Sequence, residues 1–183
     1  MKKYLQLLFI PFFSFCGQQT ETKKGNTDLE TVVESSKTEQ NATYYLIRHA
    51  EKVRTDQKNQ DPHLDAKGML RAQRWAKYFE TIEIDKIYCT KYIRTEQTIS
   101  KVAQQKKISP IIYDPNTVFS EAFLKETNNK SILIAGHSNT IPQLVNRLIG
   151  EEKYLDMEDS DNSTLFKVTI NGESKKVETI TVE

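Results

Sequence analysis

The chain has 183 residues, and its 26 Lys and Arg are nearly balanced by 25 Asp and Glu, giving a formal net charge of +1. This balance argues against a nucleic-acid-binding protein, which usually carries a clear basic excess. Its 2 cysteines cannot by themselves form a disulfide scaffold or a four-ligand zinc site, and no apolar run approaches the roughly 20 residues of a transmembrane helix. The composition predicts one soluble domain with a core of about 100–150 residues, plus additional sequence.

The first 16 residues have the pattern of an export signal. Lys2 and Lys3 form a basic start, an apolar run follows over 5–15, and Cys16 comes directly after it. A cysteine in this place resembles a lipoprotein signal, in which it becomes the lipidated first residue of the mature protein. Phe15 departs from the pattern because a small residue normally precedes the cysteine, so another export signal, an uncleaved anchor or no targeting role are the alternatives.

Residues 17–42 are predicted to be a disordered polar tether. Apart from Leu29, Val32, Val33 and Ala42, the segment consists of Gln, Thr, Glu, Lys, Ser, Asn, Asp and Gly. Such a sequence cannot bury enough apolar surface to offset its ordering entropy. A flexible chain of this length spans about 30 Å, enough to hold a domain away from a membrane surface.

Residues 43–183 alternate strand and helix patterns. A compact run of β-branched and aromatic residues predicts a strand over 43–48. Apolar residues at helical spacing, beginning with Met69, predict a helix over 66–80 with Asp65 as its N-cap. The next predicted elements in chain order are a strand over 84–89, a helix over 94–105 and a short strand over 111–113.

The second half of the domain continues the alternation and ends in a hairpin. Gly150 is placed to end the last helix, and Asn171-Gly172 supplies the turn between the last two strands. Strands separated by helices predict an α/β fold, a three-layer α/β/α sandwich around a mixed, mainly parallel sheet. The predicted elements of this half are a helix over 119–127, a strand over 131–136, a helix over 141–149 and strands over 165–170 and 176–182.

Candidate reactive residues follow three of the predicted strands. Arg48 and His49 end the first, Arg94 comes shortly after the strand over 84–89, and His137 ends the strand over 131–136. Chemistry in such sheets gathers beyond the carboxyl ends of the strands. If these strands are neighbours, two histidines and two arginines converge on one pocket.

This combination of side chains suits phosphoryl chemistry. Arginine forks match phosphate oxygens, stay charged at every useful pH and stabilise charge on a phosphoryl group in transit. Like charge around His49 should disfavour its imidazolium and lower its pKa. A neutral imidazole is a nucleophile that can accept a phosphoryl group. Because the side chains supply the positive charge, we expect no metal and no cofactor.

Four sequence blocks resemble the histidine phosphatase superfamily, the phosphoglycerate-mutase-like phosphatases, and within it the small phosphatases. The first is YLIRHAE over 45–51, similar to the family's Arg-His-Gly/Ala opening. The second is Asp61-Pro62-His63-Leu64 with Gly68, similar to the entry to the first helix. The blocks over 87–98 and 134–140 resemble the second-arginine and second-histidine motifs. They occur in the family's order and span essentially residues 43–183.

The resemblance implies a role for each matching residue. His49 would be the phosphoryl-accepting nucleophile. Many family members take one further phosphate contact from the loop after the nucleophile, where Arg54 and Thr55 stand here. The rest of the phosphate pocket would be formed by Arg48, Arg94 and His137.

The general acid that protonates the leaving group is the least defined residue. Glu121 lies near the position of the acid in mutase-like members, although its setting equally fits an ordinary first turn of a helix. Asp114 and Glu51 are its rivals. Some small members have no recognised acid and prefer good leaving groups, such as those of phosphoramidates or phosphoanhydrides.

Other candidate residues have simpler structural interpretations. His63 lies between Asp61 and Asp65, where a helix cap explains the pattern better than a metal site does. Cys89 ends a buried strand and is expected to be inert. The acidic segment 151–161 is expected to be a solvated loop, with a substrate mouth that admits cations as the alternative.

Together these patterns predict a metal-independent phosphatase that works through a phosphohistidine on His49. A mutase is disfavoured because a domain of 43–183 leaves little room for a lid over the intermediate. A non-catalytic phosphate-ligand binding protein and a cell-envelope interaction protein are the alternatives. The expected partner is a small phosphorylated substrate and not a nucleic acid. We expect the protein to be exported to the cell envelope and to meet the membrane only through a lipid anchor on Cys16.

Overall fold

The computed structural model describes residues 39–183. The predicted signal over 1–16, the lipidation of Cys16 and most of the tether lie outside the described residues and stay predictions. Within 39–183, no helix combines the length and the apolar character needed to cross a membrane. The elements are β1 (Asn41–Arg48), α1 (Ala66–Tyr78), β2 (Lys86–Cys89), α2 (Ile93–Lys106), β3 (Ile111–Ile112), α3 (Glu121–Thr127), β4 (Lys130–Gly136), α4 (Thr140–Ile149), β5 (Thr164–Asn171) and β6 (Ser174–Thr181).

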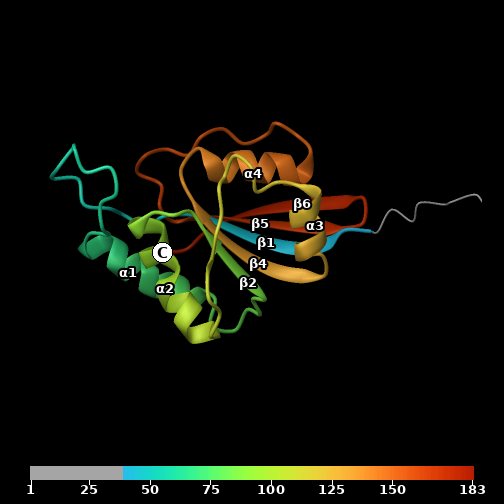
Figure 1. The fold of residues 1–183 in the computed structure, drawn as a ribbon, viewed down its shortest axis with the longest axis horizontal. Helices are drawn as coiled ribbons and strands as arrows, with labels where there is room; N and C mark the ends of the chain where they lie inside the picture. The colour runs from blue at the N-terminus through green and yellow to red at the C-terminus, as the bar shows by residue number, and fades with distance from the viewer. Residues whose placement is uncertain (1–38) are drawn as a thin grey trace, which may run out of the picture. The chain divides into compact units, whose positions relative to one another are not determined.

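The described strands form one mixed sheet in the order β3-β2-β4-β1-β5-β6 (Figure 1). β1, β4, β2 and β3 run parallel to one another, whereas β5 pairs antiparallel with β1 and β6 antiparallel with β5. This confirms the predicted mixed, mainly parallel sheet. Because β4 lies between β1 and β2, the three strands that carry the candidate residues are neighbours.

Helices cover both faces of the sheet, which confirms the predicted three layers (Figure 1). Trp75 and Phe79, at the end of α1, and Val102 of α2 belong to the core on one face. Phe123 of α3 and Leu144 of α4 belong to the core on the other. Burial of these apolar faces stabilises the fold by about 25 cal/mol for each Å² removed from water.

The central strand β1 serves both cores because side chains alternate across a strand. Tyr44 and Leu46 face the core under α3 and α4, while Tyr45 and Ile47 face the core under α1 and α2. With both faces covered, the strand reads as a continuous apolar run, as expected for the centre of such a sheet.

Several predicted bounds shift by one or two residues, and two differences have a clear physical reason. β1 begins at Asn41, so the last two residues of the predicted tether belong to the sheet. The reason is backbone pairing: Asn41 lies opposite Asn171 of β5, and the Asn128 side chain accepts its N–H at 2.7 Å. Met69 is 43% exposed, because the buried face of α1 runs instead through Ala72 and Trp75.

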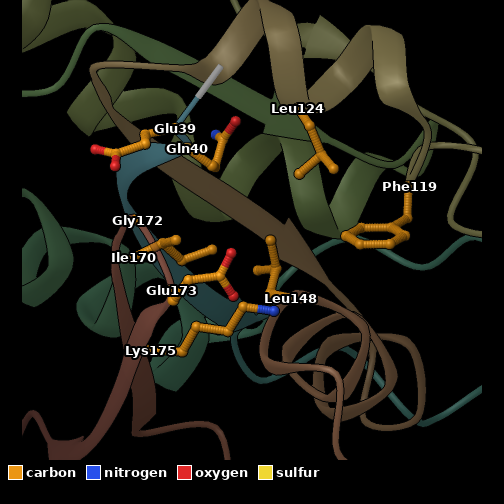
Figure 2. Close-up of a pocket in the computed structure, with 9 residues that line it drawn as sticks. All are labelled: Glu39, Gln40, Phe119, Leu124, Leu148, Ile170, Gly172, Glu173 and Lys175. Atoms are coloured by element: carbon orange, nitrogen blue, oxygen red, sulfur yellow. The ribbon is translucent and has the colours of Figure 1, made fainter. Parts of the chain in front are cut away.

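An apolar cavity of about 270 Å³ lies at the amino-terminal end of β1 and the carboxyl end of β5 (Figure 2). This is the end of β1 opposite to Arg48 and His49, so the cavity is separate from the predicted site. Its wall combines apolar side chains from several elements with charged side chains, and its lining residues are Glu39, Gln40, Phe119, Leu124, Leu148, Ile170, Gly172, Glu173 and Lys175.

Candidate active site

The carboxyl ends of β1 and β4 bring the two candidate histidines together. Arg48 lies opposite Gly136 in the parallel ladder, and the His49 N–H donates to the Gly136 carbonyl at 2.9 Å. His137 follows directly, so the centroids of the His49 and His137 rings are 5.5 Å apart. Arg94 stands in the first turn of α2, next to the end of β2. The structure therefore brings together the four residues whose convergence the strand order predicts.

Hydrogen bonds fix both the orientation and the tautomer of His49. Its Nδ1 lies 2.8 Å from the carbonyl oxygen of Ala50, which can only accept, so Nδ1 carries the proton of the neutral ring. The Nε2 lone pair is then left for a nucleophilic role. Backbone contacts hold the segment in place: Thr98 Oγ1 accepts from the Ala50 N–H at 2.8 Å, and Asn162 Nδ2 donates to the His49 carbonyl at 2.8 Å.

The pKa values of both histidines are lowered. Burial is the largest cause at His49 and, with the charges of Arg94 and Arg48, lowers its pKa to about 3, against the opposing bond to Ala50. Burial also comes first at His137, followed by the charges of Arg94 and Lys52, and its pKa falls to about 4. The predicted direction at His49 is confirmed, but desolvation outweighs the like charge from which the prediction was made.

We expect His49 to stay neutral at pH 5, with its proton on Nδ1. Nitrogen-15 NMR of the imidazole rings between pH 7 and pH 4 checks this, and a titration near pH 6.5 would contradict it. The stability consequence has a definite sign. Below about pH 6.5, the pKa of a histidine in the unfolded chain, the unfolded chain binds protons at these histidines and the folded chain does not. The free energy of unfolding should therefore decrease as the pH is lowered below about 6.5, by up to about 1.4 kcal/mol per pH unit for each such histidine.

Arg94 is held by a carboxylate from the loop before α1. Its Nη1 lies 3.4 Å from Asp61 Oδ1 and donates to the Gln60 carbonyl at 3.3 Å. Its guanidinium stacks over the Tyr92 ring at 4.1 Å from the centroid. Asp61 also accepts the Ile93 N–H at 2.9 Å, at the start of α2. Sequence reasoning placed Asp61 in a family-like block but missed that it orients the second arginine.

Arg48 is only 3% exposed and is held mainly by backbone. Its Nη1 donates to the carbonyls of Glu158, Asp159 and Asp161 at 2.9–3.1 Å, and its Nη2 donates to Asp159 Oδ1 at 3.0 Å. Residues 158–160 are exposed, as predicted for a solvated loop, but the sequence prediction missed that the segment 158–161 also supplies acceptors for Arg48. These residues fold over Arg48 because a buried guanidinium needs acceptors for its many N–H groups.

Two guanidinium nitrogens are left unpaired inside the protein. The Nε atoms of Arg48 and Arg94 are buried and have no hydrogen-bond partner. A buried donor without a hydrogen-bond partner lowers the stability of the fold by about 1–3 kcal/mol, so each such group needs an explanation. Both arginines raise the cost of protonating His49, which shows that their charges act at this ring. Charged N–H donors around a neutral histidine are suited to binding an oxyanion.

The loop after the nucleophile contributes further positive charge. Burial, followed by the charges of Arg94 and Arg54, lowers the pKa of Lys52, and its own charge acts on His137. Arg54 is 55% exposed and donates to Asp159 at 2.9 Å, and Thr55 is exposed in the same loop. Sequence reasoning named Arg54 and Thr55 but missed Lys52, although a lysine three residues after the nucleophile was a visible signal.

The three acid candidates lie in different settings. Burial alone would raise the pKa of Glu51, but the hydrogen bonds and charge of Arg71 hold it below its usual value, which leaves Glu51 without a proton to donate. Glu121 is exposed in the first turn of α3. Asp114 lines a cavity of about 600 Å³ together with Arg94 and His137. Asp114 is thus the acid candidate that shares a cavity with Arg94 and His137, whereas Glu51 lines another cavity with Lys52 and Arg54.

A family model described as the histidine phosphatase superfamily (branch 1) matches residues 44–118. This match supports the resemblance to the superfamily that the sequence motifs indicate. The matched segment includes Arg48, His49 and Arg94, and the structure adds His137 from the neighbouring strand end. No functionally curated protein matches the sequence.

Solved structures of several phosphatases and a mutase share the fold of this chain. The alpha-ribazole phosphatase of Shigella flexneri superposes with a TM-score of 0.58 at 18% identity, covering 77% of this chain and 96% of that one. The protein histidine phosphatase SixA, solved with tungstate, gives 0.60 at 17% identity over 76% and 96%. A phosphoglycerate mutase of Bacillus anthracis gives 0.57 at 16% identity over 78% and 93%.

Proposed function

We propose that this protein is a metal-independent phosphatase in which His49 carries the phosphoryl group. The Nε2 lone pair would form a bond to phosphorus while the bond from phosphorus to the ester oxygen breaks and the leaving oxygen takes a proton. Water would then attack the phosphohistidine, the N–P bond would break, and inorganic phosphate and neutral His49 would be released. The substrates would be phosphomonoesters or related phosphoryl compounds.

The proposal rests on two features found together: a neutral histidine with a free Nε2 lone pair, and arginine N–H donors that have no hydrogen-bond partner. His49 is locked in the tautomer that leaves Nε2 free, and its low pKa keeps the ring neutral at physiological pH. The buried Nε–H groups of Arg48 and Arg94 have no partner within the protein. Such donors would stabilise the charge that spreads over the phosphoryl oxygens in the transition state, without help from a metal.

Hydrolysis is favoured over a purely binding role because the nucleophile is intact. A phosphate-binding protein needs the arginines but does not need a histidine with its lone pair prepared. The match to the superfamily's model supports phosphatase-type chemistry, and two of the three compared structures are named as phosphatases. Transfer of labelled phosphate from substrate to His49 in a rapidly quenched reaction tests the proposal directly.

Asp114 is our first candidate for the proton donor because it shares the cavity of Arg94 and His137. We expect Asp114→Asn to slow hydrolysis of alkyl phosphates by about 10²-fold or more, since an alkoxide leaves poorly without a proton. Aryl phosphates should be slowed far less. Initial rates on a matched pair of alkyl and aryl substrates measure the difference.

Glu121→Gln is the matched comparison, because it removes the other candidate carboxyl from an exposed position on α3. Equal slowing of both substrate classes by Asp114→Asn would contradict an acid role for Asp114. Its function would then be structural, because its Oδ1 accepts the Asn116 N–H at 2.9 Å within the turn. A selective loss in Glu121→Gln would return the acid role to Glu121.

A further inference from the structure

One carboxylate oxygen bridges the buried and the exposed arginine of the site. Asp159 Oδ1 accepts from Arg48 Nη2 at 3.0 Å and from Arg54 Nη2 at 2.9 Å. The exposed fractions of the side chains differ sharply: 3% for Arg48, 55% for Arg54 and 73% for Asp159. Arg48 is therefore fixed, whereas Asp159 and Arg54 can move without disturbing the core.

Arg48 does not need the Asp159 side chain to keep its place. Three backbone carbonyls, those of Glu158, Asp159 and Asp161, already hold its Nη1. The main contribution of the Asp159 carboxylate to the site is therefore its negative charge, and not the positioning of Arg48. Hydrogen bonds from Arg54 and Arg48 lower the pKa of Asp159, so it is ionised at neutral pH and has no proton to offer a leaving group.

Asp159 is one of two carboxylates that pair directly with the arginines of the site. Four cations, Arg48, Lys52, Arg54 and Arg94, act on one another or on the two histidines. Two carboxylates oppose them, Asp61 on Arg94 and Asp159 on the other two arginines. With both histidines neutral, the four cations outnumber the two carboxylates that pair with them by two. Without Asp159 the excess would be three.

We propose that Asp159 is an internal counter-anion that competes with the phosphoryl dianion for Arg48 and Arg54 and so sets the affinity of the site for its substrate and product. An arriving dianion on the free Nε edge of Arg48 would repel Asp159 and release Arg54. When phosphate leaves, the carboxylate returns and opposes rebinding. The inference rests on the proposed function only in taking the ligand to be a phosphoryl oxyanion.

The test compares the full chain with Asp159→Asn, which keeps an acceptor for Arg48 but removes the charge. We expect tungstate and inorganic phosphate to bind about threefold to tenfold more tightly by calorimetry, with the gain shrinking at high salt. Pyrophosphate should gain more than phosphate. With an aryl phosphate, KM should fall while kcat stays equal or drops, because product leaves more slowly.

Asp156→Asn is the matched control, since it removes an exposed charge from the same segment. It should change none of these values. In an Arg54→Ala background the gain from Asp159→Asn should shrink, because one of the two contested cations is gone. Thermal unfolding of each variant checks that the fold is intact.

Weaker oxyanion binding in Asp159→Asn would overturn the proposal and make the carboxylate a support for Arg48. Unchanged oxyanion binding in Asp159→Asn would overturn it as well, because it would show that the ion pairs of Asp159 do not affect ligand affinity. The binding measurement stands apart from turnover. If His49 is never phosphorylated but Asp159→Asn still binds tungstate more tightly, the counter-anion role survives and the proposed hydrolysis fails.

Discussion

Replacing His49 by alanine is expected to lower kcat/KM for an aryl phosphate by at least about 10³-fold, because it removes the imidazole whose Nε2 lone pair would attack phosphorus. Wild-type protein, quenched within the first turnover of a substrate labelled on phosphorus, should carry label in a linkage that acid releases and alkali spares. The His49→Ala variant should carry none. Activity and labelling should both survive a metal chelator.

His63→Ala is the matched control for this experiment. His63 is exposed and contacts the side chain of Gln97 at 3.0 Å, away from the two facing histidines. Its removal should leave labelling and turnover near wild type. Turnover that persists in His49→Ala, or that disappears with the chelator, would refute the mechanism. Tungstate binding retained by an inactive wild-type protein would instead favour the binding-protein alternative.

The main residues of the site were predictable because they follow predicted strands and stand in motifs that resemble the superfamily, whereas the strand order that brings them together comes from the structure. The apolar run before Arg48 and the run before His137 could only be buried strands of a sheet covered on both faces. Once such strands lie side by side, the residues at their carboxyl ends must meet. Local patterns also sufficed for caps: Asp65 accepts the Gly68 N–H at 2.8 Å, as a predicted N-cap should.

The partners that orient these residues could not be predicted in the same way. Arg48 is held by carbonyl oxygens more than 100 residues later in the chain, and a backbone acceptor leaves no side-chain signature in a sequence. Asn162 reaches His49 over a similar separation. An acidic run such as 151–161 is usually solvated, and only the tertiary fold decides that part of it must satisfy a buried guanidinium.

Gly68→Ala is expected to destabilise the fold by about 3 kcal/mol, although alanine has the higher helix propensity. Helix propensity alone predicts a gain of about 1 kcal/mol for this change within α1. Here a Cβ would collide with the Glu51 carbonyl oxygen and lie 2.9 Å from the Glu51 carbonyl carbon. Those are backbone atoms, so neither partner can yield by a rotamer change. Urea unfolding of the variant and the wild type measures the difference.

Ala66→Gly isolates the propensity effect, because it makes the reverse change at an exposed position of the same turn. It should cost no more than about 1 kcal/mol. Gly68→Ala should also reduce the activity of the molecules that remain folded. Glu51 lies two residues after the nucleophile and anchors Arg71 of α1, so pushing α1 away shifts the loop that fixes His49. A stabilised and fully active Gly68→Ala variant would mean that α1 does not pack this closely on the site.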